Sequence, residues 1–269
     1  MTRLSTRFSE LQARNERALI PYLSAGYPHP DFTVKIMHSL EKGGADVIEL
    51  GVPFSDPLAD GPTIQAASAV ALSHGVNIDT IFGFVRKYRQ EGGQLPVVLF
   101  GAYNPFLHYG FERFANAAKD AGADGVLIAD LPADESDEAT PTVKAAGLDL
   151  ICLIAPTSNL ERKRLIASKG SGFLYYISLK GVTGARQDLQ FELGDSIEEI
   201  RSCTDLPIAV GFGISTPAQA AQVGQWADGV IVGSALIDLV TKHKDAPGDE
   251  LYAAVENYMR ELKQALPAR

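Results

Sequence analysis

The sequence predicts a single (β/α)8 barrel, a closed ring of eight parallel strands with one extra helix before the first strand. Most of its short β-rich runs are uninterrupted apolar segments, as in parallel strands that are buried on both faces. Amphipathic stretches separate these runs, and about 34 residues per unit is the size of a strand–helix pair. The eight runs are 19–23, 47–50, 97–100, 125–129, 148–154, 173–177, 208–211 and 229–232. Eight units without a long linker favour one barrel domain over 1–269, rather than an open sheet.

The segments between these runs have the pattern of helices. Phe111, Phe114, Ala115 and Ala118 share one helical face, and residues 249–266 predict a final helix. Before the first strand, an apolar stripe of Leu4, Phe8 and Leu11 is expected to cover one end of the barrel. Helix starts are expected at the capping residues Asp31, Thr63, Ser158 and Thr216, the last followed by Pro217.

Three segments resemble one another and support a repeated unit. Residues 44–48, 122–126 and 227–231 each place a small residue and an aspartate just before an apolar run. In the first two, a glycine stands where helices commonly end. We therefore expect each segment to close a helix and open a strand.

The composition excludes several classes of function. With 24 basic and 33 acidic residues, the net charge is −9, and no basic cluster is available for nucleic acid. No apolar run approaches the roughly 20 residues of a membrane span, and no signal peptide is recognised. Cys152 and Cys203 show no paired spacing, so we expect buried free thiols and a cytoplasmic protein. The five histidines lack metal-ligand spacing, so no metal is expected.

The active site of such a barrel lies at the carboxyl ends of its strands. Glu49 lies near the end of the second apolar run, 47–50, where strand alternation can direct it into the barrel. A carboxyl group buried there would have a raised pKa, which suits a general acid–base. The alternative is that Glu49 leaves the strand into solvent. Asp56 and Asp60 follow in a proline-rich loop, where an ordinary turn role is the alternative.

Two glycine-containing regions follow later strands. Residues 178–186 suggest a lid that closes over substrate, although a flexible surface loop is equally consistent with the glycines. After the seventh and eighth runs come 211–215 and 233–235, where glycines and a helix start at Ser234 predict a phosphate site.

At these positions the sequence resembles the α-subunit family of tryptophan synthase. The matching stretches are 21–28 (PYLSAGYP), 48–62 (IELGVPFSDPLADGP), 103–105 (YNP), 129–132 (ADLP), 181–185 (GVTGA) and 210–214 (VGFGI). They span the chain in order, and the second is the most specific. The resemblance implies a lyase of tryptophan biosynthesis that cleaves indole-3-glycerol phosphate to indole and glyceraldehyde 3-phosphate.

The resemblance also implies residue roles. It makes Glu49 and Asp60 catalytic, with Thr183 of the lid positioning Asp60 on closure. The implied substrate-binding residues are Tyr22, Phe100, Tyr175, Gly184, Phe212, Gly213, Gly233 and Ser234. It implies no cofactor in this chain. The expected partner is a β subunit that uses pyridoxal phosphate, joined in an α2β2 heterotetramer, with the Asp56 and Asn104 loops facing it.

Other functions remain open at this point. A free-standing indole-releasing lyase would share the same site residues. A regulatory module would mainly activate a β partner, although intact Glu49, Asp60 and Thr183 argue against it. Another phosphate-binding barrel would share the late glycines but not the Glu49–Asp60 loop.

Overall fold

The computed structural model describes residues 2–178, 187–211 and 213–269, with the backbone alone for 187–192. Within this part of the chain, eight parallel strands close into a barrel in chain order, which confirms the predicted fold. The strands are β1 Ala18–Ser24, β2 Ile48–Gly51, β3 Val97–Gly101, β4 Gly125–Ile128, β5 Asp149–Ile154, β6 Leu174–Ile177, β7 Ile208–Gly211 and β8 Gly229–Val232. β7 and β8 have the predicted bounds, and the other strands differ by one residue at one or both ends.

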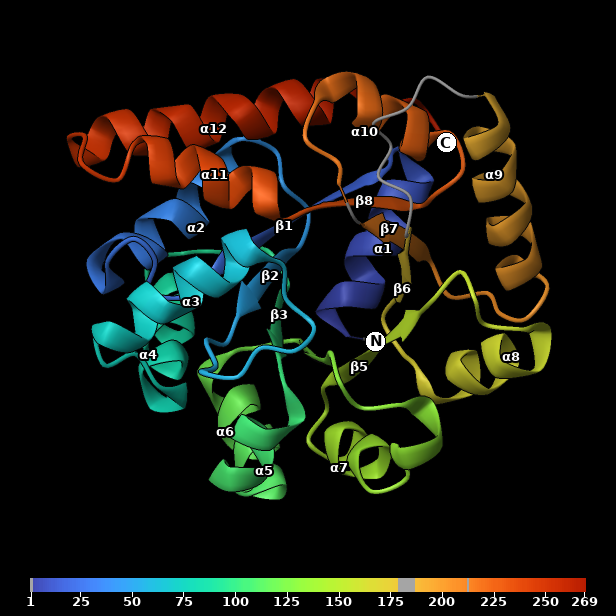
Figure 1. Ribbon diagram of the computed structural model, residues 1–269, viewed down its shortest axis with the longest axis horizontal. Helices are drawn as coiled ribbons and strands as arrows, with labels where there is room; N and C mark the ends of the chain where they lie inside the picture. Colours follow the sequence, from blue (N-terminus) through green and yellow to red (C-terminus); the bar gives the residue numbers. More distant parts are fainter. Residues whose placement is uncertain (1, 179–186, 212) are drawn as a thin grey trace.

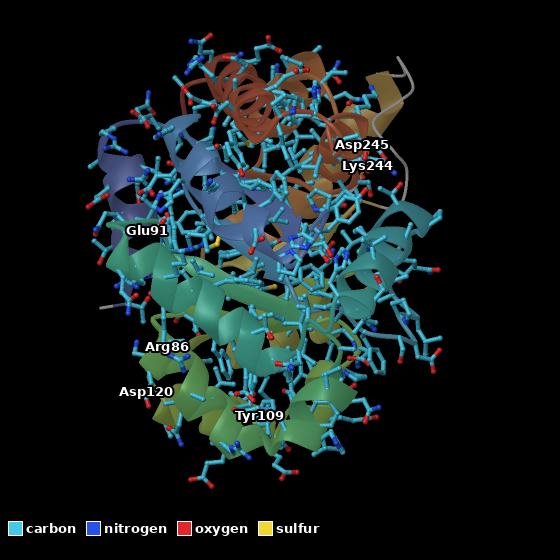
Figure 2. The ribbon with its side chains drawn as sticks, turned by 90° about the vertical axis from the view of Figure 1, so that its left-hand side faces the viewer. Arg86, Glu91, Tyr109, Asp120, Lys244 and Asp245 are labelled. Carbon is cyan, nitrogen blue, oxygen red and sulfur yellow. The ribbon has the colours of Figure 1, made fainter. Side chains whose placement is uncertain are left out.

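Helices surround the strands (Figure 1). They are α1 Arg3–Ala13, α2 Thr33–Lys42, α3 Pro62–Ser73, α4 Ile78–Gln90, α5 Tyr103–Tyr109, α6 Phe111–Ala121, α7 Ala139–Ala145, α8 Leu160–Lys169, α9 Gln187–Arg201, α10 Pro217–Gly224, α11 Ser234–Lys242 and α12 Gly248–Ala265, with 3-10 turns η1 Pro30–Phe32 and η2 Ala133–Glu135. Their apolar faces pack on the barrel, while Arg86 and Asp120 lie at its periphery (Figure 2).

Only one of the four predicted helix caps is confirmed. Thr216 forms a capping box with Gln219, and Pro217 takes the first helical position. The caps predicted at Asp31, Thr63 and Ser158 are wrong. Helix α3 begins two residues earlier than a cap at Thr63 predicts, with Gly61 at the cap position, because Pro62 already has the φ of a first helical residue. Asn159 caps α8 instead, since its side chain accepts the N–H of Arg162.

The extra helix α1 closes the amino-terminal end of the barrel, as predicted. Its residues Leu4, Phe8 and Leu11 are buried. They form one apolar cluster with inward-facing strand residues, namely Ala18, Ile20, Val47, Val98, Leu127, Ile151, Phe173, Ala209 and Ile231. The barrel floor is therefore a packed layer, and only the opposite end is open to a ligand.

The three repeated segments perform the same structural task. Asp46, Asp124 and Asp228 each accept the N–H of a residue on the preceding strand, those of Leu19 (2.8 Å), Val97 (2.9 Å) and Ile208 (2.9 Å). Each aspartate is buried and forms ion pairs with at least two cationic side chains. The expectation that these segments close a helix and open a strand is confirmed for 44–48 and 122–126, whereas 227–231 opens β8 but follows a helix that already ends at Gly224.

The cysteines differ from expectation in their burial. Cys152 and Cys203 are free thiols, as predicted, but both are half-buried rather than buried. Burial still raises the pKa of the Cys152 thiol to about 11, so this thiol stays protonated at neutral pH.

Candidate active site

A cavity of about 500 Å³ opens at the carboxyl ends of the strands. It brings together eight of the predicted site residues, from β1, β2, β3, β6, the β2–α3 loop, the β7–α10 loop and the start of α11. They are Tyr22, Glu49, Asp60, Phe100, Tyr175, Gly213, Gly233 and Ser234. A volume of this size suits a small organic ligand.

Strand alternation explains why Glu49 faces this cavity. Val47, two residues earlier, belongs to the inward-facing cluster under α1. Side chains two apart on a strand share a face, so Glu49 also points inward, one position nearer the mouth. Its direct partner on β1 is Tyr22. The barrel thus places a carboxyl group at the top of its apolar filling.

The Glu49 side chain is fully buried, and neither carboxyl oxygen has a hydrogen-bond partner among the described residues. The alternative that Glu49 points into solvent is therefore wrong. Burial raises its pKa well above the ordinary value for glutamate, because the charged form loses hydration. The raised pKa favours the protonated form of this carboxyl group, which can donate its proton to a ligand.

Asp60 approaches the cavity from the loop between β2 and α3. Its backbone fixes the end of this loop: the Gln65 side-chain amide of α3 donates to the Asp60 carbonyl at 2.8 Å. The carboxyl group itself forms no hydrogen bond or ion pair among the described residues. Partial burial raises the pKa of Asp60 too. Two carboxyl groups in different surroundings therefore face one cavity, as acid–base catalysis requires.

Three aromatic rings form a wall of the cavity. The Tyr22 and Phe100 centroids lie 5.4 Å apart with the planes at 82°, and Phe100 meets Tyr175 at 6.5 Å and 88°. Edge-to-face packing of this kind holds the rings in fixed orientations. The wall can accept a flat apolar ligand beside Glu49.

The part of the cavity formed by the β7–α10 loop and the start of α11 is suited to binding an anion. Gly213 has φ +74°, and Gly233 precedes α11, whose first residue is Ser234. The N–H groups of the first turn of a helix have no partner within the helix, so they can bind phosphate oxygens. Among the described lining residues there is no Lys, Arg or His, so backbone N–H and hydroxyl groups would supply the binding here.

Some predictions cannot be compared with this geometry. Thr183, Gly184 and Phe212 lie outside the described residues. Across the described ranges, no group of three or more His, Cys, Asp or Glu side chains could hold a metal ion.

The cavity also includes residues that the sequence analysis did not name as site residues: Ile64, Leu153, Ile177 and Asp238. Ser215 of the predicted phosphate segment 211–215 lines it as well. Strand alternation offered a signal for Leu153 and Ile177, which lie two residues from inward-facing positions. For Asp238, the signal was its position four residues after Ser234 on one helix face.

A second hollow of about 420 Å³ lies on the rim beside this cavity. Phe54 and Ser55 of the β2–α3 loop line it, together with Asn104 and Pro105 of α5. Nearby on the same rim, Leu58 is 91% exposed and Leu107 is 50% exposed. Leu58 and Leu107 do not line the hollow itself, whereas Phe54 and Pro105 do, and an apolar hollow of this kind can bind another protein.

Comparison with known proteins identifies the family. The family model described as tryptophan synthase alpha chain matches residues 8–267. The chain belongs to the tryptophan synthase alpha chain family. The resemblance stated from the sequence motifs is thereby confirmed.

Relatives of the tryptophan synthase alpha chain family match along the full length of the chain. The tryptophan synthase alpha chain of Geobacter sp. (strain M21) is 46% identical over 266 residues, covering 99% of this chain and 98% of that protein. The one from Methylococcus capsulatus is 46% identical over 268 residues, covering 100% of both. Tryptophan synthase subunit alpha from Legionella pneumophila superposes with a TM-score of 0.92 at 41% identity, covering 99% and 98% of the two chains.

Proposed function

We propose that this member of the tryptophan synthase alpha chain family cleaves indole-3-glycerol phosphate to indole and glyceraldehyde 3-phosphate. The single observation that supports this most is the buried Glu49 carboxyl, which has no hydrogen-bond partner among the described residues. It lies beside an aromatic wall in the cavity that Asp60 and the N-terminus of α11 also line. The indole ring would lie along the wall, and the phosphate would bind near Gly213, Gly233 and Ser234.

The proposed roles of the two carboxyl groups follow from their surroundings. Protonated Glu49 donates its proton to C3 of the indole ring, while Asp60 accepts the proton from N1, which gives the neutral indolenine tautomer. The Glu49 carboxylate then takes the proton of the hydroxyl on the carbon attached to C3. The bond between C3 and that carbon breaks, its electron pair enters the ring, and Asp60 returns the proton to N1. Indole and the aldehyde result, and both carboxyl groups recover their starting states.

The remaining predicted residues complete this proposal. Thr183 would position Asp60, and Gly184 and Phe212 would contact the substrate phosphate. Tyr22, Phe100 and Tyr175 would enclose the indole. We propose that 1–269 acts as one catalytic domain in the cytoplasm and uses no cofactor of its own. Among the described residues, no helix is long and apolar enough to span a membrane.

The partner we propose is a β subunit, assembled with this chain as α2β2 and holding pyridoxal phosphate in its own site. The rim hollow supports this proposal, because apolar residues of the two expected partner-facing segments, Phe54 of the β2–α3 loop and Pro105 of α5, line it. The hydrogen bond from the Tyr103 N–H to Asp130 (2.6 Å) holds the start of α5 on this rim.

Indole release tests the proposal. We expect purified protein to release indole from indole-3-glycerol phosphate, faster when a β subunit is added. Glu49→Gln and Asp60→Asn should each lose at least about a hundredfold in kcat, as expected for positioned acid–base groups, while still binding glycerol 3-phosphate. Wild type that is inactive with and without the partner would refute the lyase function. If the rate of indole release without the β subunit equals the rate with it, the result would favour a free-standing lyase.

A further inference from the structure

The Tyr22 ring is part of the apolar wall of the cavity, but its hydroxyl group is polar and lies at a specific position above the strand β2. Tyr22 is the register partner of Glu49, and its side chain is buried. A Cβ built on Gly51 would come within 3.0 Å of the Tyr22 hydroxyl oxygen. The ring therefore extends from the level of Glu49 to the level of Gly51, the next inward position toward the mouth.

This direction takes the phenol toward Asp60. A small cavity of about 20 Å³ adjoins the main one, and both Tyr22 and Asp60 line it, whereas Glu49 lines only the main cavity. Chain direction agrees, because Gly51 ends β2 and the loop after it contains Asp60. The Tyr22 hydroxyl thus lies on the side of Glu49 that faces the second carboxyl group.

The residues that line the two cavities offer few other hydrogen-bond donors to the Asp60 carboxylate. Besides Asp60 itself, the ionisable groups that line the two cavities are the carboxyls of Glu49, Asp130 and Asp238 and the phenols of Tyr22 and Tyr175. Among the described lining residues there is no cationic side chain. Burial, together with the charges of Asp60 and Glu49, raises the pKa of Tyr22 far above its usual value, so the phenol keeps its proton as a donor.

We propose that the Tyr22 hydroxyl donates a hydrogen bond to the Asp60 carboxylate when substrate is bound, and so positions it on the indole N–H. This inference rests on the proposed function. Tyr22 is then a positioning residue that acts through Asp60, in addition to being part of the aromatic wall. Its donor stabilises the ionised form of Asp60, which is the form that accepts the N1 proton.

The test is Tyr22→Phe, which keeps the ring and removes the hydroxyl. We expect kcat to fall about tenfold or more, the scale of a hydrogen bond to a charged group. The Michaelis constant should change less than about threefold. Without the donor, the pKa of Asp60 rises, so the acidic limb of the pH–rate profile should move up by about one unit.

Tyr88→Phe is the matched control. Tyr88 of α4 is also a buried tyrosine that donates to a carboxylate, that of Glu41 at 2.7 Å, and it lines neither cavity. The Tyr88→Phe substitution should leave kcat and the pH–rate profile unchanged. Binding of a 3-alkylindole with a terminal phosphate should be equal in wild type and Tyr22→Phe, which also shows that the variant is folded.

Other outcomes would overturn the inference. One is a Tyr22→Phe enzyme with kcat within twofold of wild type and an unmoved acidic limb. Another is a Tyr22→Phe enzyme in which only the Michaelis constant rises, because Tyr22 would then contribute to substrate binding in the aromatic wall and not to the position of Asp60. In an Asp60→Asn background, Tyr22→Phe should cost less than twofold more, and a larger loss would contradict action through Asp60. Failure of the proposed function is distinct, because wild type itself would then release no indole.

Discussion

The phenol of Tyr175 occupies the space over Gly211 on the neighbouring strand. The register pairs Ile177 with Gly211, so the Tyr175 ring leans one inward position toward the barrel mouth. A Cβ built on Gly211 would lie closer than 3.0 Å to the hydroxyl oxygen, a separation that real Cβ atoms essentially never show. Tyr22 and Gly51 have the same relationship. Each glycine is therefore needed for the position of a cavity tyrosine.

Gly211→Ala should displace Tyr175 and disturb the aromatic wall beside Glu49. We expect kcat/KM for indole release to fall at least about tenfold, because catalysis is sensitive to displacements of about 1 Å. Steady-state kinetics measures this loss, and circular dichroism checks that the barrel is retained.

Gly83→Ala is the matched control within α4. No heavy atom lies within 4 Å of a Cβ built on Gly83. Activity should be unchanged, and alanine should stabilise the helix by up to about 1 kcal/mol. Equal activity of Gly211→Ala and wild type would show that the Tyr175 position is not constrained by this glycine.

Burial of Glu49 links stability to pH. Its folded pKa is raised above the ordinary 4.5. The stability associated with its protonated form is therefore fully present below pH 4.5 and is lost as pH rises through the folded pKa. Glu49→Gln has no carboxyl to ionise, so it should gain stability relative to wild type on going from pH 5 to pH 8.

Urea unfolding at the two pH values measures this difference, which we expect to exceed about 1 kcal/mol. A constant stability difference between Glu49→Gln and wild type from pH 5 to pH 8 would argue against a raised pKa.

Asp46 connects both ends of the chain to the barrel. Its carboxylate accepts from the Leu19 N–H (2.8 Å) and pairs with Lys263 of α12 (2.7 Å) and Arg7 of α1 (2.9 Å). Asp46→Ala would leave these donors without their partner, so it should destabilise the fold by about 3 kcal/mol. Chemical denaturation measures the cost, while kcat of the folded variant should stay unchanged.

Asp137→Ala removes an ion pair of another kind, since Asp137 is 79% exposed where it meets Lys169. An exposed pair contributes about 1 kcal/mol or less. If the two alanine variants proved equally stable, burial of Asp46 would not be the cause of its contribution.

Asp238 opposes phosphate binding in the proposed complex. It lies one turn after Ser234 on α11 and lines the cavity there. Asp238→Asn should lower the Michaelis constant about threefold at low salt with kcat unchanged, and the difference should shrink at 0.5 M salt. Asp245→Asn, an exposed residue outside the cavity lining, should show no change. A salt-independent effect would exclude charge repulsion.

Much of the candidate site was predictable because local patterns specify it. The apolar run 47–50 predicted a strand, and alternation made an inward direction of Glu49 one of two alternatives. The glycines before Ser234 predicted a helix start in an anion-binding position. Helix caps were less predictable, as at Thr63, because neighbouring residues such as Pro62 also satisfy the local rules.

The direction of Glu49 stayed open between the barrel interior and solvent, whereas the sequence by itself determined the eight-strand barrel and the family resemblance. These follow from apolar periodicity and from motifs that are continuous in the chain. Only the tertiary structure decided that Tyr22 extends over Gly51, that Tyr175 extends over Gly211, and that Asp238 faces the cavity that Asp60 lines. Such proximities depend on ring closure and on the lean of side chains across neighbouring strands, which bring together residues that are far apart in the chain.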